Sequence, residues 1–339
     1  MKKSKLISAI FIGVSFIFSS LSYAQIKSPS PSSIKGLPNG TIVGNYSVAV
    51  YDIEREENFA HIKLVSRKMR SSLNLYPFKY VVAIDDHDNK YVPDFFLPIF
   101  SDEFENLLIS APVGLTWSFS VTVQIPEAAP IVKVELYNYP PYPTQVSKAI
   151  GSIQTNLFGF DIEKEIRKIE MKGANLISIG SSINQGKYLQ WSIGKIRAIN
   201  TWIRYENFSI DKEWLIPITV DNLDYNPTQF NLRFFFQLND GAILPYKAWI
   251  AHSMEDYNGG YYCEGCDGTL NNARFLDWQT SLSEIHAKST KYLNYYHFPV
   301  SINRQIQEPI RVFVLNGNGR ARGKEKLYIL RVTPEIFEY

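Results

Sequence analysis

Two stretches of the chain, "FKYVVAIDDHDNKYVP" (residues 78–93) and "FNLRFFFQLNDGAILP" (residues 230–245), align without a gap at a constant offset of 152 residues. In this alignment Phe78 falls on Phe230. Each stretch predicts a strand, a tight Asp-Asn or Asp-Gly turn and a returning strand. The same hairpin therefore occurs in both halves of the chain, which predicts an internal repeat.

A second pair of stretches extends the repeat. "FSVTVQIPEAAPIVKVEL" (119–136) aligns with "FPVSINRQIQEPIRVFVL" (298–315), again without a gap, at an offset of 179 residues. The change from 152 to 179 gives the second copy 27 additional residues between Pro245 and Phe298. The chain's only two cysteines lie in this interval.

The runs between and around these pairs predict the fold class. Short alternating or apolar runs bounded by turn residues are typical of antiparallel strands, and "NYPPYPTQ" (138–145) interrupts them. "FDIEKEIRKIEMKG" (160–173) then has isoleucines at helical spacing, with Asp161 placed as an N-cap and Gly173 just past the end. We therefore predict an all-β protein with two tandem immunoglobulin-like antiparallel β-sandwiches joined by a short helix.

The first residues predict export. Lys2, Lys3 and Lys5 precede an apolar run that is shorter than the ~20 residues a bilayer core requires, and Ser22-Tyr23-Ala24 ends it as a cleavage site. We expect the protein in the periplasm, at the cell surface or secreted. The predicted organisation is a signal peptide at 1–24, a flexible leader at 25–39, a first β-sandwich at 40–143, a linker with the short helix at 144–173, and a second β-sandwich at 174–339 with an insertion at about 250–295.

The charge of the mature chain argues against polyanion binding. The whole sequence has 35 Lys+Arg and 33 Asp+Glu, and the signal peptide removes three lysines and no acids, which leaves 32 basic and 33 acidic residues. A net charge of −1 does not hold nucleic acid non-specifically. No second run of ~18 apolar residues predicts a membrane span after signal cleavage. We predict no cofactor, and the oligomeric state stays open.

The aligned hairpins and strands resemble the telokin-like, immunoglobulin-type β-sandwiches of exported bacterial proteins. The resemblance implies a sandwich module used for recognition, without catalytic residues. It covers two stretches of each half. The residues that carry it are Asp85, Asp86, Asp88, Tyr91, Phe119, Val121, Pro130 and Leu136 in the first copy, and Asp240, Gly241, Phe298, Val300, Pro309 and Leu315 in the second.

Three interpretations remain for Cys263 and Cys266 in "CEGC". A disulfide suits an exported protein with an even cysteine count, and it is the pairing that we predict. A redox pair would need to lie at the start of a helix. Residues 271–293 could form a helix, but it would begin several residues after Cys266. Zinc would need two further ligands, for which His252 and His286 are the nearest candidates.

Other chemical signals are weaker. The acidic run "IDDHDNKY" (84–91) has the oxygens of a calcium site, but Phe96 stands where an EF-hand loop needs a glutamate, so we predict a hairpin turn. No metal site is assigned. Gly-x-Ser-x-Gly is absent and no catalytic residue is assigned. A hydrolase would use a carboxylate pair such as Glu255 and Asp256.

Aromatic residues gather in and beside the insertion. Exposed aromatic rings stack on sugars and anchor protein interfaces, although they could equally pack the insertion onto the sandwich. We predict a non-catalytic protein that binds a protein or glycan partner in the envelope or outside the cell; the alternatives are a secreted hydrolase or a subunit of a surface assembly that uses a strand edge. The predicted ligand-binding residues are Trp249, Tyr257, Tyr261, Tyr262 and Trp278.

Overall fold

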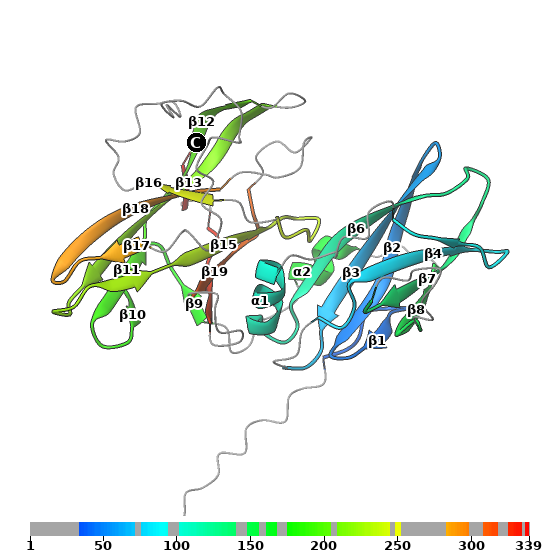
Figure 1. Cartoon of the computed structure of the whole chain (residues 1–339), viewed down its shortest axis with the longest axis horizontal. Coiled ribbons are helices and arrows are strands. Elements are labelled where there is room, and N and C mark those ends of the chain that lie inside the picture. The colour runs from blue at the N-terminus through cyan, green and yellow to red at the C-terminus, as the bar shows by residue number, and fades with distance from the viewer. Residues whose placement is uncertain are drawn as a thin grey trace, which may run out of the picture. The chain divides into compact units, whose positions relative to one another are not determined.

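Figure 1 shows the computed structural model of the chain. It describes residues 34–71, 76–93, 102–139, 148–155, 161–167, 175–204, 209–244, 248–251, 283–297, 308–317, 325–333 and 336–338. Strands dominate these residues, so the prediction of an all-β fold is confirmed at that level. Among them, no helix is long and apolar enough to span a membrane. The predicted domain boundaries stay a prediction.

The described residues form twenty-one strands and two helices. The first half contains β1 (Thr41–Val43), β2 (Tyr46–Glu56), β3 (Phe59–Lys68), β4 (Tyr80–Asp85), β5 (Lys90–Tyr91), α1 (Asp102–Ser110), β6 (Thr116–Gln124), β7 (Ile131–Tyr137) and β8 (Gly151–Gln154). The second half contains α2 (Ile162–Arg167), β9 (Asn175–Ile177), β10 (Ile183–Gln185), β11 (Leu189–Ile193), β12 (Ile196–Arg204), β13 (Ser209–Asn222), β14 (Thr228–Phe230), β15 (Leu232–Gln237), β16 (Ala248–Ala251), β17 (Ser283–Ile285), β18 (Ser289–His297), β19 (Arg311–Asn316), β20 (Lys326–Leu330) and β21 (Phe337–Glu338).

Two four-stranded sheets form the first half. Sheet A has the order β1-β2-β3-β6 and sheet B the order β5-β4-β7-β8, and all their pairs are antiparallel. Alternating side chains from both sheets enter one hydrophobic cluster, to which β3 contributes Ile62 and Leu64 and β7 contributes Val134 and Leu136. Burial of these apolar side chains is what holds the two sheets to a common core.

The described residues of the second half also form two main sheets, C and D. Sheet C has the order β15-β19-β20-β9. Sheet D has the order β10-β11-β13-β12-β21, with β18 and then β16 added beside β13. The short pair β14-β17 lies apart from this path. A second hydrophobic cluster takes side chains from both sheets, among them Trp191 and Trp214 of sheet D and Phe234 and Phe236 of sheet C.

The strands of the two aligned segments pair in the same register. In the β4-β7 pair Tyr80 lies opposite Tyr137. Shifting these residues by the offsets read from the sequence gives Leu232 and Asn316, which lie opposite one another in the β15-β19 pair. The alignment thus predicts the strand register of sheet C from that of sheet B.

The turns of the two hairpins differ by one residue. In the first, the Asp85 N–H donates to the Asn89 carbonyl; in the second, the Leu238 N–H donates to the Ala242 carbonyl. The left-handed residue moves accordingly, from Asp88 at φ 63° to Gly241 at φ 84°. Glycine suits this second position because an added Cβ would lie 2.7 Å from the Ile166 side chain.

Strand β15 of sheet C is buried on both faces. Even-numbered residues of β15 enter the cluster shared with sheet D, whereas Phe235, and Phe313 on β19, belong to the first-half cluster. All six residues of β15 are buried. The three consecutive phenylalanines 234–236 suit a strand that is covered on both faces.

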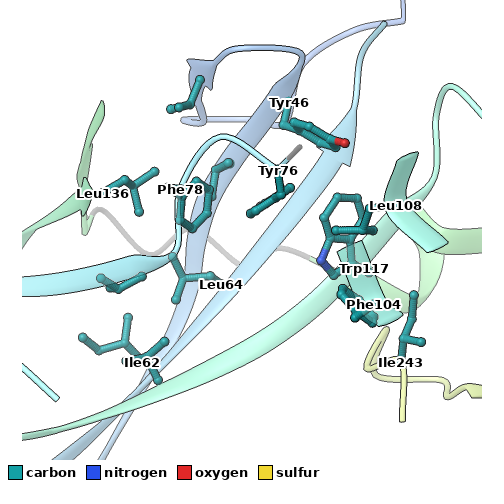
Figure 2. Packing of buried hydrophobic residues seen from close by; sticks show 14 of the residues in the cluster. Tyr46, Ile62, Leu64, Tyr76, Phe78, Phe104, Leu108, Trp117, Leu136 and Ile243 are labelled. Carbon is teal, nitrogen blue, oxygen red and sulfur yellow. The ribbon is translucent and has the colours of Figure 1, made fainter. Parts of the chain in front are cut away.

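Helix α1 contributes to the first-half cluster, which also contains side chains of the second half. Figure 2 shows Phe104 and Leu108 of α1 near Trp117 of β6 and Ile243 of the second half. The helix also contacts β20. The two halves of the chain therefore have hydrophobic cores that meet, and they are not joined by the linker alone.

A buried lysine caps α1. The Lys68 ammonium, at the end of β3, donates to the carbonyls of Leu108, Ile109 and Ala111 at 2.7, 2.8 and 2.8 Å. These carbonyls belong to the C-terminal end of the helix, where positive charge is favourable. Burial lowers the pKa of Lys68 to about 8.

Two predictions of helices have different outcomes. The predicted N-cap of α2 is confirmed, since the Lys164 N–H donates to the Asp161 carboxylate at 2.9 Å. The helix considered for residues 271–293 is wrong where the structure describes it, because β17 and most of β18 lie there. Residues 289–297 pair with β13 over nine positions, so sheet D takes them as a strand.

Candidate functional site

Three turns converge at one end of sheet D and form a surface that we call the loop tip. It consists of residues 186–188 between β10 and β11, residues 223–226 after β13, and residues 286–288 between β17 and β18 (Figure 1). The Leu223 N–H donates to the Tyr188 carbonyl at 2.7 Å. The Lys288 N–H donates to the Asp224 carbonyl at 2.9 Å. Main-chain hydrogen bonds therefore fix the middle turn to the other two.

The buried side chain of Asn222 holds the turns of the loop tip together through hydrogen bonds. Its side chain is buried, and its amide donates to the carbonyls of Asn226, Ile285 and His286 at 2.9, 3.2 and 3.0 Å. Its side-chain oxygen accepts the Asp224 N–H at 3.0 Å. One amide thus satisfies four backbone groups from two turns, and such a buried, fully engaged group favours a single loop conformation.

The side chains at the loop tip point into solvent. Tyr225 is 83% exposed, Leu223 is 43% exposed and Tyr188 is 42% exposed. Large apolar side chains are usually buried, and contiguous exposed ones mark interaction surfaces more often than single ones do. The hydrogen bonds of the backbone hold these turns in one conformation, so the exposed side chains are presented on an ordered surface.

Lysine ammonium groups lie over both tyrosine rings of the loop tip. Lys288 Nζ is 4.1 Å from the centroid of the Tyr225 ring, and Lys187 Nζ is 4.9 Å from the centroid of the Tyr188 ring. Lys288 Nζ also donates to the Leu223 carbonyl. These contacts hold each ring in place and leave its other face for a partner.

None of the predicted ligand-binding residues belongs to the three turns of the loop tip. Trp249 is in β16 and lies opposite Tyr296 of β18. β18 in turn pairs with β13, so β16 is at an edge of sheet D. Tyr257, Tyr261, Tyr262, Trp278, Cys263, Cys266, Glu255, Asp256 and His252 fall outside the described residues. The binding role of these aromatic residues, the disulfide and the carboxylate pair therefore stay predictions. His286 lies in the loop tip and is exposed.

The acidic run after β4 forms the predicted hairpin turn. The Asp85 carboxylate accepts the N–H groups of His87 and Asn89, each at 2.8 Å, and the Asn89 amide and the Tyr91 hydroxyl, also at 2.8 Å. Asp85, Asp86 and His87 lie close enough for a metal ion, but the oxygens of Asp85 are engaged by the turn. Burial alone would raise the pKa of Asp85, yet these hydrogen bonds outweigh it and hold the pKa at about 2.

A change of Asp85 to asparagine is expected to destabilise the fold at pH 7 and to matter less in acid. The pKa of Asp85 is depressed in the folded state from 3.8 to about 2, so the stabilisation is present above about pH 4 and is lost as the pH falls through about 2. Urea unfolding at pH 7, 4 and 2 measures the difference from wild type. Asp86→Asn, in the same turn, is the control, and a loss from Asp85→Asn that does not change with pH would contradict this account.

Comparisons with known proteins do not assign this chain to a family. No family model matches it, and no curated protein matches it. Among solved structures it is similar to the yjhA protein from Bacillus subtilis, with 11% identity, a TM-score of 0.25, and coverage of 46% of this chain and 98% of that chain. A TM-score this low carries no argument about fold or function.

The loop tip could have been found in part from the sequence. "LDYNP" (223–227) has a tyrosine between turn-forming residues, which predicts an aromatic ring on a surface turn. Its convergence with the other two turns depends on strand pairing across sheet D. No local pattern in the sequence gives that pairing.

Proposed function

We propose that this protein is an exported, non-catalytic binding protein that recognises a protein or glycan partner through its loop tip. The observation that carries the proposal is the Tyr225 ring, 83% exposed on a turn whose backbone is fixed by hydrogen bonds. Loops positioned by a rigid sheet are where recognition residues concentrate. Tyrosine suits both partners, because its ring stacks on sugars and anchors protein interfaces.

The proposal includes the tandem immunoglobulin-like architecture. Support comes from the equal register of the β4-β7 and β15-β19 pairs and from the two hydrophobic clusters, one with side chains from sheets A and B and the other with side chains from sheets C and D. In such sandwiches the loops at one end form the recognition surface. The loop tip is at one end of sheet D, which is the corresponding place.

A binding screen with a matched pair of variants tests the proposal. The purified protein is applied to a glycan array and used as bait in envelope extracts, together with Tyr225→Ala and with Tyr139→Ala, whose ring is 69% exposed in the first half. We expect Tyr225→Ala to lose on the order of tenfold or more in affinity, as a central tyrosine does when truncated. Tyr139→Ala should bind as wild type does.

Two results would contradict the proposal. One is a ligand bound equally well by wild type and Tyr225→Ala. The other is equal weakening by Tyr225→Ala and Tyr139→Ala, which would indicate a loss of non-specific contact. Thermal unfolding of both variants controls for folding, and the exposed position of Tyr225 predicts a change in stability within about 0.5 kcal/mol.

A further inference from the structure

β6 is a long strand at the edge of sheet A. It pairs with β3 along its whole length, from Thr116 opposite Arg67 to Gln124 opposite Phe59, without a shift of register. On its other side the described residues provide a single bridge, between Ser118 and Ala242. Figure 1 shows β6 beside β3, at the side of the sheet away from β1.

The direction of the peptide groups along β6 follows from two hydrogen bonds. The Ser118 N–H points away from β3, because it donates to the Gly241 carbonyl at 3.0 Å. The Ile125 N–H points the other way and donates at 2.8 Å to the Asn58 carbonyl in the β2-β3 turn. Since successive residues of a strand alternate, even-numbered residues direct their N–H and C=O groups outward.

Ser120, Thr122 and Gln124 therefore present a row of outward backbone groups. Within the described part of the chain, no hydrogen bond is made to these outward N–H and C=O groups. Their side chains are exposed, whereas Val121 and Val123 between them are buried. A row of free donors and acceptors on a regular, half-buried strand is a template for another strand.

The other sheet edges that the structure describes are protected. Most are short: β1, β5, β8, β9, β10, β16 and β21 have two to four residues each. β15 is longer but buried throughout. β12 has a bulge between Asn200 and Ile203 and carries Arg197 and Arg204. β6 has none of these devices, since it contains no charged residue, no proline and no bulge.

We propose that residues 120–124 pair with the same residues of a second copy of this chain. In an antiparallel arrangement centred on Thr122, each Thr122 faces its counterpart and Ser120 faces Gln124 of the second copy. All three residues are even-numbered, so the outward N–H and C=O groups of one copy face those of the other and can form hydrogen bonds. The facing side chains are neutral, and no like charges oppose one another. This surface is separate from the loop tip and does not depend on the function proposed for it.

The pairing would stop at two copies. Joining the β6 edges makes sheet A continuous across a twofold axis, which uses the same patch on both chains. The free edges of the joined sheet are then the two β1 strands, each of three residues, and residues 49–56 of each β2, which β1 does not cover. The β1 strands give little template for further chains because they are short, and the uncovered part of β2 carries four charged residues and a register shift after Val50, so we expect a dimer and not a fibre.

Sedimentation velocity of the purified protein and three variants tests this pairing. Wild type is expected to have twice the mass of one chain. Ser120→Pro removes one outward N–H and leaves the ladder to β3 intact, so it should sediment as a monomer. Ser120→Ala, which changes the side chain and keeps the N–H, should remain a dimer.

Thr122→Lys covers the case in which Ser120→Pro fails to fold. It keeps the backbone donor and places two ammonium groups opposite each other across the axis, so it should also be a monomer with a wild-type circular dichroism spectrum. Wild type that sediments as a monomer at every concentration up to its solubility limit would overturn the proposal. So would folded Ser120→Pro and Thr122→Lys proteins that remain dimers.

Discussion

Replacing Phe313 by alanine is expected to lower the free energy of unfolding by about 3–5 kcal/mol. The Phe313 side chain is fully buried in the cluster that joins sheet C to the first half. Its removal deletes apolar contact area and leaves a cavity that neighbouring rings fill only in part. The expected loss is a large fraction of the 5–15 kcal/mol typical of a folded protein.

Because the cluster is shared, both halves should respond to Phe313→Ala. Urea unfolding followed by tryptophan fluorescence and by far-ultraviolet circular dichroism should show one transition in wild type and one, at lower urea, in the variant. Tyr292→Ala, at a ring 66% exposed on β18, serves as the control and should change little. Two separate transitions, of which only one shifts, would contradict a shared core.

Replacing Lys68 by alanine is expected to cost on the order of 3 kcal/mol at pH 7. The change leaves three buried carbonyls at the end of α1 without their donor and opens a cavity at the side of the first-half cluster. Relief from burying a charge offsets only part of this loss. Lys63→Ala is the matched control on the same strand, because Lys63 pairs with Asp52 and Glu54 near the surface, where such pairs contribute about 0–1 kcal/mol.

The contribution of Lys68 should grow between about pH 8 and 9.5. Its folded pKa of about 8 lies below the value of 10.5 in the unfolded chain, so the folded protein releases this proton first. Between these values the unfolded state binds more protons, and stability therefore rises with pH. The difference in unfolding free energy between wild type and Lys68→Ala should be larger at pH 9.5 than at pH 7; a smaller difference would contradict the assigned environment.

The sequence predicts strand positions well where the repeat is visible. The 152 and 179 residue offsets match the register of β15-β19 to that of β4-β7. Each pair joins strands that lie far apart in the sequence, so the shared register reflects the side-chain pattern of the strands and not a local turn. The same comparison does not show why β15 is apolar at consecutive positions. An isolated sandwich would leave one face of this strand in water, and here Phe235 and Phe313 enter the first-half cluster. Contacts between distant segments decide that burial.

The candidate site was predictable only in its chemistry. Exposed aromatic residues on loops of the second half are expected from composition, and the loop tip provides them at Tyr188 and Tyr225. The sequence predicts them instead in the insertion, where aromatic residues are densest. The number of aromatic residues in a segment does not show which of their rings are exposed. The exposed rings of the loop tip depend on Asn222, which holds two turns together, and its position depends on which strands pair.

Footprinting of the bound protein tests the proposed binding surface most directly. Side chains are oxidised by hydroxyl radicals before and after addition of the ligand that the screen identifies, and the products are located by mass spectrometry. We expect protection of Tyr188, Leu223 and Tyr225 and none of Tyr139. Unchanged oxidation of the loop tip, with protection confined to residues 252–294 or to the first half, would contradict the proposal.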